Sequence, residues 1–195
     1  MATSLNYSTN CRYFSGYKPC GKSLACNVEC SSYSPVNTRI LIVHLGAMGA
    51  VVRSTSLLKS IRRKYPHGHI TWITESPMQS ILEGNPLIDR ILVNDVHGHV
   101  ILKALKFDVA MIIDKSLESS GLLAMTTAKE VFGFMAGPAS GAILPATAAA
   151  EELWQLGLDD NKKFFVNKKT ESQLVTEALE LPYLNDDYFV PVSIE

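Results

Sequence analysis

Two groups of residues in this 195-residue chain have the types and spacing that ligand binding requires. The first is a glycine turn, Gly46-Ala47-Met48-Gly49, and the second is a set of four cysteines near the N-terminus. A strand that ends in a glycine-bearing loop and opens a helix often binds ligands in α/β proteins. Glycine lets the backbone approach a ligand closely, and the first N–H groups of the helix attract anions. We therefore look for function first at the glycine turn, including Met48 within it.

The spacing of the turn matches neither of the common nucleotide-binding patterns. The dinucleotide pattern G-x-G-x-x-G and the phosphate-cradling pattern G-x-x-x-x-G-K-[ST] are both absent around Gly46 and Gly49. On spacing alone, a purely structural tight turn and a ligand site are equal alternatives. A Rossmann-like nucleotide-binding protein is the least favoured of the functional classes because the fingerprint is missing.

Polar residues end two buried runs of the sequence. His44 ends the run that precedes the glycine turn, and Asp114-Lys115 end the later apolar run 107–113. The carboxyl ends of neighbouring parallel strands converge on the ligand crevice of an α/β sheet, so we expect these side chains to lie near each other. The structural alternatives are capping or surface positions for His44 and Asp114, and a simple ion pair for Asp114 and Lys115.

Three further polar residues follow the turn. Arg53, Ser54 and Thr55 occupy the first turns of the expected helix, beside its positive end, where they suit contacts to ligand hydroxyls or phosphates. Ordinary helix surface, with Thr55 packed toward the sheet, is the alternative of equal weight.

The four cysteines of the chain all lie between positions 11 and 30, with the spacing C-x8-C-x5-C-x3-C. Disulfides are unusual in a reduced cytosol, and this polar segment cannot build a core of its own. We therefore expect a structural zinc ion with thiolate ligands Cys11, Cys20, Cys26 and Cys30. A cubane iron–sulfur cluster uses the same ligand set, and free or oxidised cysteines are the third alternative. The remaining histidines form no metal motif, and we expect solvent-exposed positions for His67, His69, His97 and His99.

The elements that would position these residues are predicted by the alternation of short β-branched runs with helical patterns over residues 39–134. This alternation is typical of a Rossmann-like parallel sheet with helices on both faces. We expect strands at 39–44, 69–74, 89–93, 107–113 and 130–134. We expect helices from the glycine turn to residue 65 and at 77–83, 100–105 and 118–128.

The rest of the chain divides into a loop, two helices and a tail. Residues 135–145 are expected to form a loop, and Thr147 to cap a helix over 148–156. Thr170 is expected to cap a second helix that runs through residue 179, and residues 188–192 to form an edge strand or linker. The predicted organisation is a Cys-rich, metal-stabilised segment at 1–38 and one α/β domain at 39–195.

The composition excludes several function classes. A net charge of −1 argues against an electrostatic nucleic-acid binder, and the short basic cluster around residues 59–64 suits the end of a helix. No apolar run reaches the roughly 18–20 residues of a membrane span, and residues 1–10 lack the apolar region of a secretory signal. We expect a cytoplasmic protein. Peripheral contact with the inner face of a membrane is compatible with this expectation.

Three sequence blocks carry a resemblance to a known family. They are the strand, turn and helix at 40–58 with its continuation at 61–66, the strand at 69–73, and the segment 82–92. Their order and spacing resemble the N-terminal domain of glycosyltransferase family 9, the ADP-heptose:lipopolysaccharide heptosyltransferases. The resemblance continues more faintly through residues 106–108 and 112–115 and covers the chain from 39 to about 181.

The resemblance implies a GT-B enzyme, in which two Rossmann-like domains face each other across a cleft. The N-terminal domain would receive the acceptor, a glycan or a lipid-linked sugar, and the C-terminal domain would bind the nucleotide-sugar donor. Transfer would invert the anomeric centre without a metal at the reacting atoms. In the family the glycine turn ends in Gly-Asp, and the aspartate is the proposed base that deprotonates the acceptor hydroxyl.

This sequence departs from the family in two respects. The residue after Gly49 is Ala50, whose methyl group cannot accept a proton. The chain is therefore an inactivated copy, uses another base such as His44 or Asp114, or acts in binding only. The chain also ends near the point where one domain of this class is complete, so the donor-binding domain is expected to be absent.

Two hypotheses of different class follow. The first is the acceptor-side domain of a heptosyltransferase-like enzyme of bacterial lipopolysaccharide or surface-glycan assembly, inactive alone. The second is a non-catalytic module that binds a glycan or a protein partner.

Overall fold

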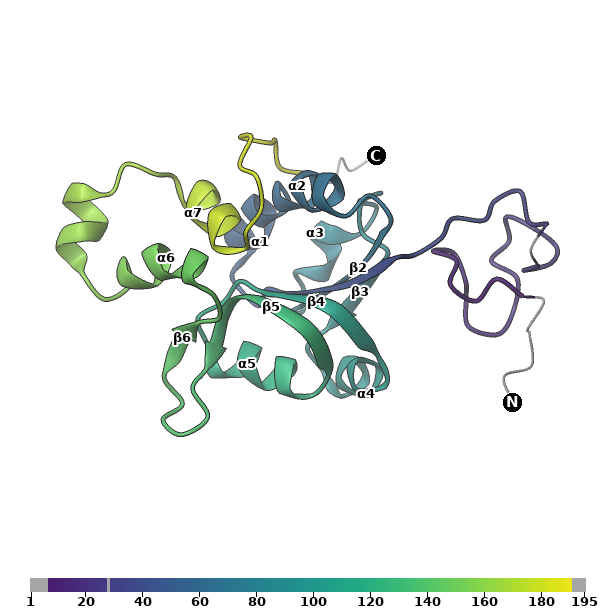
Figure 1. Cartoon of the computed structure of the whole chain (residues 1–195), viewed down its shortest axis with the longest axis horizontal. Coiled ribbons are helices and arrows are strands. Elements are labelled where there is room, and N and C mark those ends of the chain that lie inside the picture. The colour runs from purple at the N-terminus through teal and green to yellow at the C-terminus, as the bar shows by residue number, and fades with distance from the viewer. Residues whose placement is uncertain (1–6, 28, 191–195) are drawn as a thin grey trace.

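The computed structural model describes residues 7–27 and 29–190, and its centre is a six-stranded sheet with the order β3-β2-β1-β4-β5-β6 (Figure 1). The strands are β1 (Thr38–Val43), β2 (Gly68–Thr74), β3 (Arg90–Val93), β4 (Lys106–Ile112), β5 (Thr127–Ala136) and β6 (Ile143–Pro145). The first five are mutually parallel, and β6 pairs antiparallel with β5. The predicted α/β fold class is therefore confirmed.

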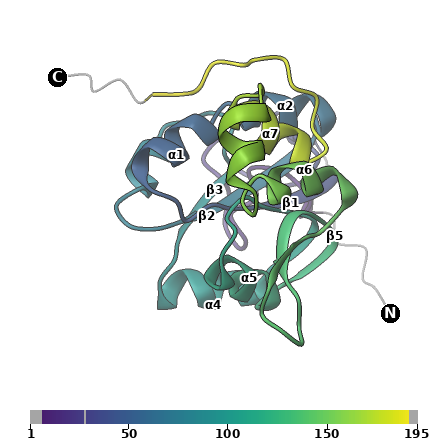
Figure 2. The ribbon, with the colours of Figure 1, turned by 90° about the vertical axis from the view of Figure 1, so that its left-hand side faces the viewer.

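Helices cover both faces of the sheet (Figures 1 and 2). One face carries α1 (Met48–Ser54), α2 (Leu57–Lys64), α3 (Gln79–Leu82) and α7 (Glu171–Ala178), and the other carries α4 (Val96–Ala104) and α5 (Leu117–Ala124). Alternation along β1 explains this arrangement. Ile40 and Ile42 belong to the core beneath α1 and α2, whereas Leu41 and Val43 pack in the core beneath α4 and α5. Both sets are fully buried, as expected for a strand covered on two sides.

The helix expected after the glycine turn is divided. It ends at Ser54, and α2 begins at Leu57. The hydroxyl of Thr55 donates to the Val52 carbonyl at 2.6 Å, and that of Ser56 donates to the Arg53 carbonyl at 2.8 Å. Consecutive hydroxyl side chains compete for the backbone carbonyls that a continuous helix would use, which accounts for the break.

Other boundaries also differ from expectation. The helix expected at 118–128 ends at Ala124, because β5 already begins at Thr127. The expected loop 135–145 contains β6, which forms a hairpin with β5. Gly137, Pro138 and Gly141 in the connection hid this pairing, since they are typical of loops as well as of hairpin turns.

The expectations for the two late helices had different outcomes. Thr170 caps α7 by accepting a hydrogen bond from the backbone of Gln173, as predicted. The prediction for Thr147 was wrong, because its side chain makes no capping bond. A 3-10 turn, η1 (Ala148–Ala150), follows Thr147 instead and leads into α6 (Glu151–Gln155), and a short π-helix, η2 (Lys162–Val166), comes next. The tail has no strand up to residue 190, and the rest of the expected strand 188–192 lies outside the described residues.

The N-terminal segment stands to one side of the domain (Figure 1). Its described residues, 7–27 and 29–37, contain no helix or named strand, only isolated bridges from Tyr7 to Asn27 and from Cys11 to Pro35. Arg12 joins the segment to the domain through an ion pair with Asp89. Among the described residues, no helix has the length and apolar character needed to cross a membrane.

Candidate functional site

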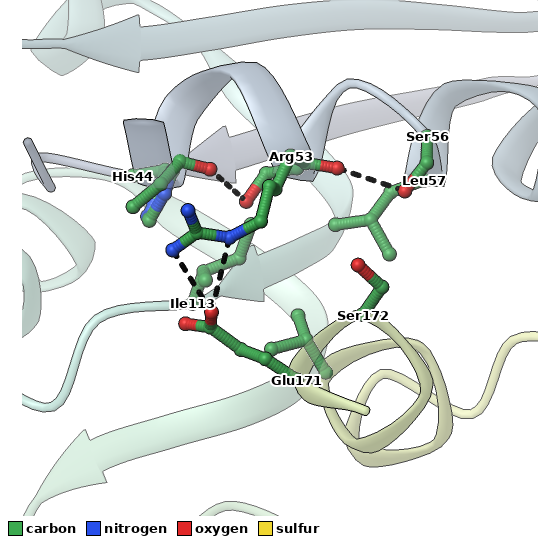
Figure 3. A pocket seen from close by; sticks show the side chains of 10 residues that line it. His44, Arg53, Ser56, Leu57, Ile113, Glu171 and Ser172 are labelled. Atoms are coloured by element: carbon green, nitrogen blue, oxygen red, sulfur yellow. Dashed lines mark hydrogen bonds and ion pairs between the residues drawn. The ribbon is translucent and has the colours of Figure 1, made fainter. Parts of the chain in front are cut away.

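A small crevice opens at the carboxyl ends of β1 and β4, beside the glycine turn (Figure 3). Its volume is about 30 Å³, the share of one water molecule, so the side chains around it nearly close it. It is lined by His44, Ala50, Arg53, Ser54, Ser56, Leu57, Ile113, Glu171, Ser172 and Val175. Imidazole, hydroxyl, guanidinium and carboxylate groups therefore share one space at the edge of the sheet.

His44 and Asp114, expected to converge because they end neighbouring strands, are in direct contact. The register of β1 and β4 pairs Val43 with Ile112, which places the residues that follow side by side. The Nδ1 atom of His44 lies 3.0 Å from one carboxylate oxygen of Asp114, and the backbone N–H of Leu45 donates to the other at 2.6 Å. The carboxylate thus holds both the imidazole ring and the start of the glycine turn.

The second imidazole nitrogen of His44 has no such partner. The side chain is 6% exposed, and its Nε2 atom is buried without a hydrogen-bond partner among the described residues. Buried polar atoms are almost always paired, so an unpaired one calls for an explanation. His44 also lines the crevice, so a ligand group in that space is a candidate partner for Nε2.

Gly46 makes room for this imidazole ring. A Cβ atom at Gly46 would lie 2.9 Å from Cε1 of His44 and 3.3 Å from both its Nε2 and the Cβ of Ala50. Contacts this short would force the ring to move. The first glycine of the turn is therefore needed here for the position of His44, in addition to any ligand contact.

Arg53 and Glu171 close the crevice from opposite sides (Figure 3). The guanidinium of Arg53, on α1, donates to the carboxylate of Glu171, at the start of α7, with distances of 2.9 Å and 3.1 Å. The two side chains are 48% and 62% exposed, and exposed pairs of this kind are weak. A ligand can displace this ion pair at low cost, which would open the space behind it.

The structure places the other predicted site residues differently. Ser54 lines the crevice, whereas Met48 and Gly49 do not. Thr55 is buried under the tail, where its hydroxyl accepts a hydrogen bond from the backbone N–H of Phe189 at 2.7 Å. Lys115 faces a neighbouring cavity of about 420 Å³.

That second cavity shares Glu171 with the crevice. It is lined by Lys115, Leu153, Leu156, Gly157, Lys163, Asn167, Lys169, Glu171 and Leu174. Partial burial lowers the pKa of the Lys115 amine, which stands 4.9 Å from the centre of the Phe134 ring, and Glu171 works against this shift. Glu171 pairs with Arg53, and Lys169 pairs with Glu152 and Glu177. Among the described residues, Lys115 and Lys163 are the lysines of this lining that form no ion pair.

The sequence matches no family model and no curated protein. Among solved structures, a glycosyltransferase of family 9 from Veillonella parvula is 25% identical with a TM-score of 0.40, covering 50% of this chain and 33% of its own. The E. coli heptosyltransferase WaaC with ADP-2-deoxy-2-fluoro heptose is 14% identical with a TM-score of 0.49, covering 78% of this chain and 50% of its own. WaaC with ADP is 16% identical with a TM-score of 0.44, covering 49% and 36%.

These structures come from the family that the sequence blocks resemble. The chain spans half of their length or less. The matches are likenesses over part of the chain, and they leave the roles of individual residues as predictions.

Three polar lining residues, Ser56, Glu171 and Ser172, are absent from the site that the sequence predicts. The sequence pattern indicates Ser56 only as part of a helix and Glu171 only as an acid in the first turn of α7, and it gives no signal for Ser172. Glu171 is 118 positions from Arg53 along the chain, and no local pattern signals such a contact. The position of an acidic residue in the first turn of a helix is the one feature of the sequence that indicates Glu171.

The four cysteines line a common cavity in the N-terminal segment, together with Tyr13, Phe14 and Tyr33. All four are free thiols of intermediate burial, so no disulfide joins them. Among the described residues, no three His, Cys, Asp or Glu side chains are gathered closely enough to hold an ion as they stand. To hold an ion together, the thiols would have to move closer, with a rearrangement of the loops around them.

Proposed function

We propose that this chain is the acceptor-side domain of an inverting, heptosyltransferase-like glycosyltransferase that serves lipopolysaccharide or related surface-glycan assembly. The observation that carries the proposal is the crevice at the carboxyl ends of β1 and β4. Serine hydroxyls, a displaceable ion pair and an imidazole surround it, and these are groups that hydrogen-bond to sugar hydroxyls. The resemblance of three sequence blocks to glycosyltransferase family 9 supports the same assignment, and donor binding would belong to a second domain.

A lipid-linked acceptor suits the surroundings of the crevice. The cavity lined by Lys115 and Lys163 adjoins it and offers space for a second, anionic part of the acceptor. Beyond this cavity, η2 exposes Phe164, Phe165 and Val166, with exposed fractions of 65%, 75% and 63%. Lysines flank these apolar residues in the sequence, an arrangement that favours contact with an anionic membrane surface.

The proposal is tested by titrating the ¹⁵N-labelled chain with a heptose-free inner-core oligosaccharide of lipopolysaccharide. We expect amide shifts at residues 44–57 and at Glu171 and Ser172, because these residues surround the crevice. Ser54→Leu should fill the crevice and weaken binding by about tenfold or more, equivalent to roughly 1.4 kcal/mol.

Ser80→Leu is the matched control, since Ser80 is an exposed serine of α3 outside the crevice. It should leave the affinity unchanged. Equal effects of the two substitutions, or no shifts at millimolar oligosaccharide, would refute the acceptor assignment. Binding of the oligosaccharide without transfer in the presence of a donor-binding domain and ADP-heptose would instead identify a non-catalytic glycan-binding module.

We also propose that the N-terminal cysteines hold a structural zinc ion. Support comes from the cavity that Cys11, Cys20, Cys26 and Cys30 share and from the small apolar content of the segment around it. Zinc prefers four thiolates in a tetrahedral arrangement, and its binding would supply the folding free energy that this segment lacks.

Elemental analysis of the purified chain should find one zinc per chain, and Cys20→Ser together with Cys26→Ser should abolish it. Iron in place of zinc would indicate the iron–sulfur alternative. A metal-free sample whose N-terminal segment resists proteolysis would refute the metal proposal altogether.

A further inference from the structure

We propose that His44 is the general base of the transfer reaction and that Asp114 is the residue that positions it. This inference rests on the proposed function and adds a residue role to it. Ala50 occupies the position after the turn and has no proton acceptor. The imidazole of His44 borders the same crevice as Ala50.

The hydrogen bonds around Asp114 determine which nitrogen of His44 carries the proton. One carboxylate oxygen accepts the backbone N–H of Leu45 at 2.6 Å. The other lies 3.0 Å from Nδ1 of His44, and an ionised carboxylate can only accept. Nδ1 is therefore the protonated nitrogen, and Nε2 presents a lone pair. A carboxylate that fixes the tautomer and orientation of an imidazole in this way is a recurrent arrangement in catalytic sites.

The free nitrogen is placed to act on a ligand. Nε2 is buried and unpaired among the described residues, and its ring lines the crevice. It also lies near Ala50, since a single Cβ atom placed on Gly46 would stand 3.3 Å from both. A base at Nε2 would thus serve nearly the same part of the crevice as a carboxylate at position 50.

In the proposed step, Nε2 takes the proton of the acceptor hydroxyl while the hydroxyl oxygen forms a bond to the anomeric carbon of the donor sugar. The bond from that carbon to the diphosphate oxygen breaks, and the nucleoside diphosphate leaves with the electron pair. The imidazolium so formed is stabilised by the Asp114 carboxylate. The other charged groups that line the crevice, Arg53 and Glu171, pair with each other.

The tautomer is measured on the chain itself, by the ¹⁵N spectrum of its histidine side chains. We expect an unprotonated Nε2 for His44 at pH 8, and a change in its tautomer ratio in Asp114→Asn. A protonated Nε2, with Nδ1 as the acceptor, would overturn the inference.

Transfer from ADP-heptose is measured with the chain joined to a donor-binding domain. His44→Gln should lower kcat by about 10²–10⁴, the usual contribution of a general base. Asp114→Asn should lower it by up to about 10⁴, because an imidazole in the wrong tautomer presents no proton acceptor at Nε2. His67→Gln is the matched control at an exposed histidine and should leave kcat unchanged.

A rescue separates a base from a merely structural residue. Ala50→Asp in the His44→Gln background should restore transfer at least tenfold. Full transfer activity of His44→Gln would refute the general-base role of His44 and leave the proposed transferase function standing. If every form is inactive, Ala50→Asp included, the proposed transferase function fails, while the tautomer measurement stands by itself.

Discussion

Replacing Asp89 by asparagine should lower the free energy of unfolding by about 3 kcal/mol or more, because it breaks a buried ionic network at one partner. The Asp89 side chain is 7% exposed and pairs with Arg62 at 2.8 Å and with Arg12. It also accepts the backbone N–H of Ile70 at 2.7 Å. The amide nitrogen of asparagine would replace one carboxylate oxygen and point a donor either at Arg12 or at Arg62 and the Ile70 N–H. In both orientations the 12% exposed Arg62 would lose its counter-charge.

Urea denaturation at pH 7 measures this loss, and Asp187→Asn is the matched control. Asp187 is 98% exposed and stands 4.0 Å from Lys59, so its replacement should change stability by less than about 0.5 kcal/mol. An Asp89→Asn chain as stable as the control would show that the network contributes nothing. The variant should also loosen the N-terminal segment, since Arg12 links that segment to the domain.

The same network determines the direction in which the free energy of unfolding changes as the pH falls. Burial alone would raise the pKa of Asp89, but hydrogen bonds from Ile70, Arg62 and Arg12 outweigh it and hold the pKa below its ordinary value. A lowered carboxyl pKa means that the stabilisation is present above the pKa of the unfolded state, about 3.9. It is lost as the pH falls through the lower pKa of the folded state.

The sequence was sufficient for the five parallel strands, of which the central ones are buried on both faces, but it did not predict β6. Such strands appear as continuous apolar runs, and residues 40–43 are all 0% exposed in the structure. The same reasoning placed His44 and Asp114 at neighbouring strand ends, where they do meet. Strand ends that share an edge of the sheet are set by topology, and topology follows from the alternation of elements.

The features that the sequence did not predict are of two kinds. Some depend on contacts between residues that are distant in sequence, and others on side-chain hydroxyls that compete for backbone hydrogen bonds within a short stretch. Glu171 reaches the crevice because α7 packs on the same face of the sheet as α1, and no local pattern encodes that packing (Figure 2). The break between α1 and α2 depends on hydroxyls that bond backward to the chain, while the apolar spacing continues through it. Side-chain competition of this kind is invisible to hydrophobic periodicity.

His69 is the histidine whose environment differs most from the sequence-based expectation, and His99 is also only partly exposed. The sequence predicts a solvent-exposed position, but His69 lies within β2 and is 8% exposed. Its place in a strand covered on both faces explains the burial. Desolvation lowers its pKa to about 4, against the opposing attraction of Asp89, and the nearby guanidiniums of Arg90, Arg39 and Arg12 add to the lowering. The imidazole of His69 is therefore neutral in the folded protein at neutral pH.

This burial should make the protein less stable as the pH falls from neutral toward 4. The unfolded chain takes up a proton at His69 near pH 6.5, whereas the folded chain does so only near pH 4. Between these values the unfolded state binds more protons, so the free energy of unfolding decreases as the pH is lowered. At about 1.36 kcal/mol per pH unit, the loss from His69 alone between pH 7 and pH 5 is about 2 kcal/mol.

Urea denaturation of His69→Phe at pH 7 and pH 5 isolates this contribution. Phenylalanine keeps a planar aromatic ring, suits a strand and cannot take up a proton, so the variant should lose less stability than the wild type over the same interval. His97→Gln, at an exposed position of α4, should keep the wild-type dependence. If His69→Phe and the wild type lose the same free energy on acidification, the buried imidazole is not the titrating group. The Asp89 network would not account for that loss, because its stabilisation is lost only below about pH 3.9.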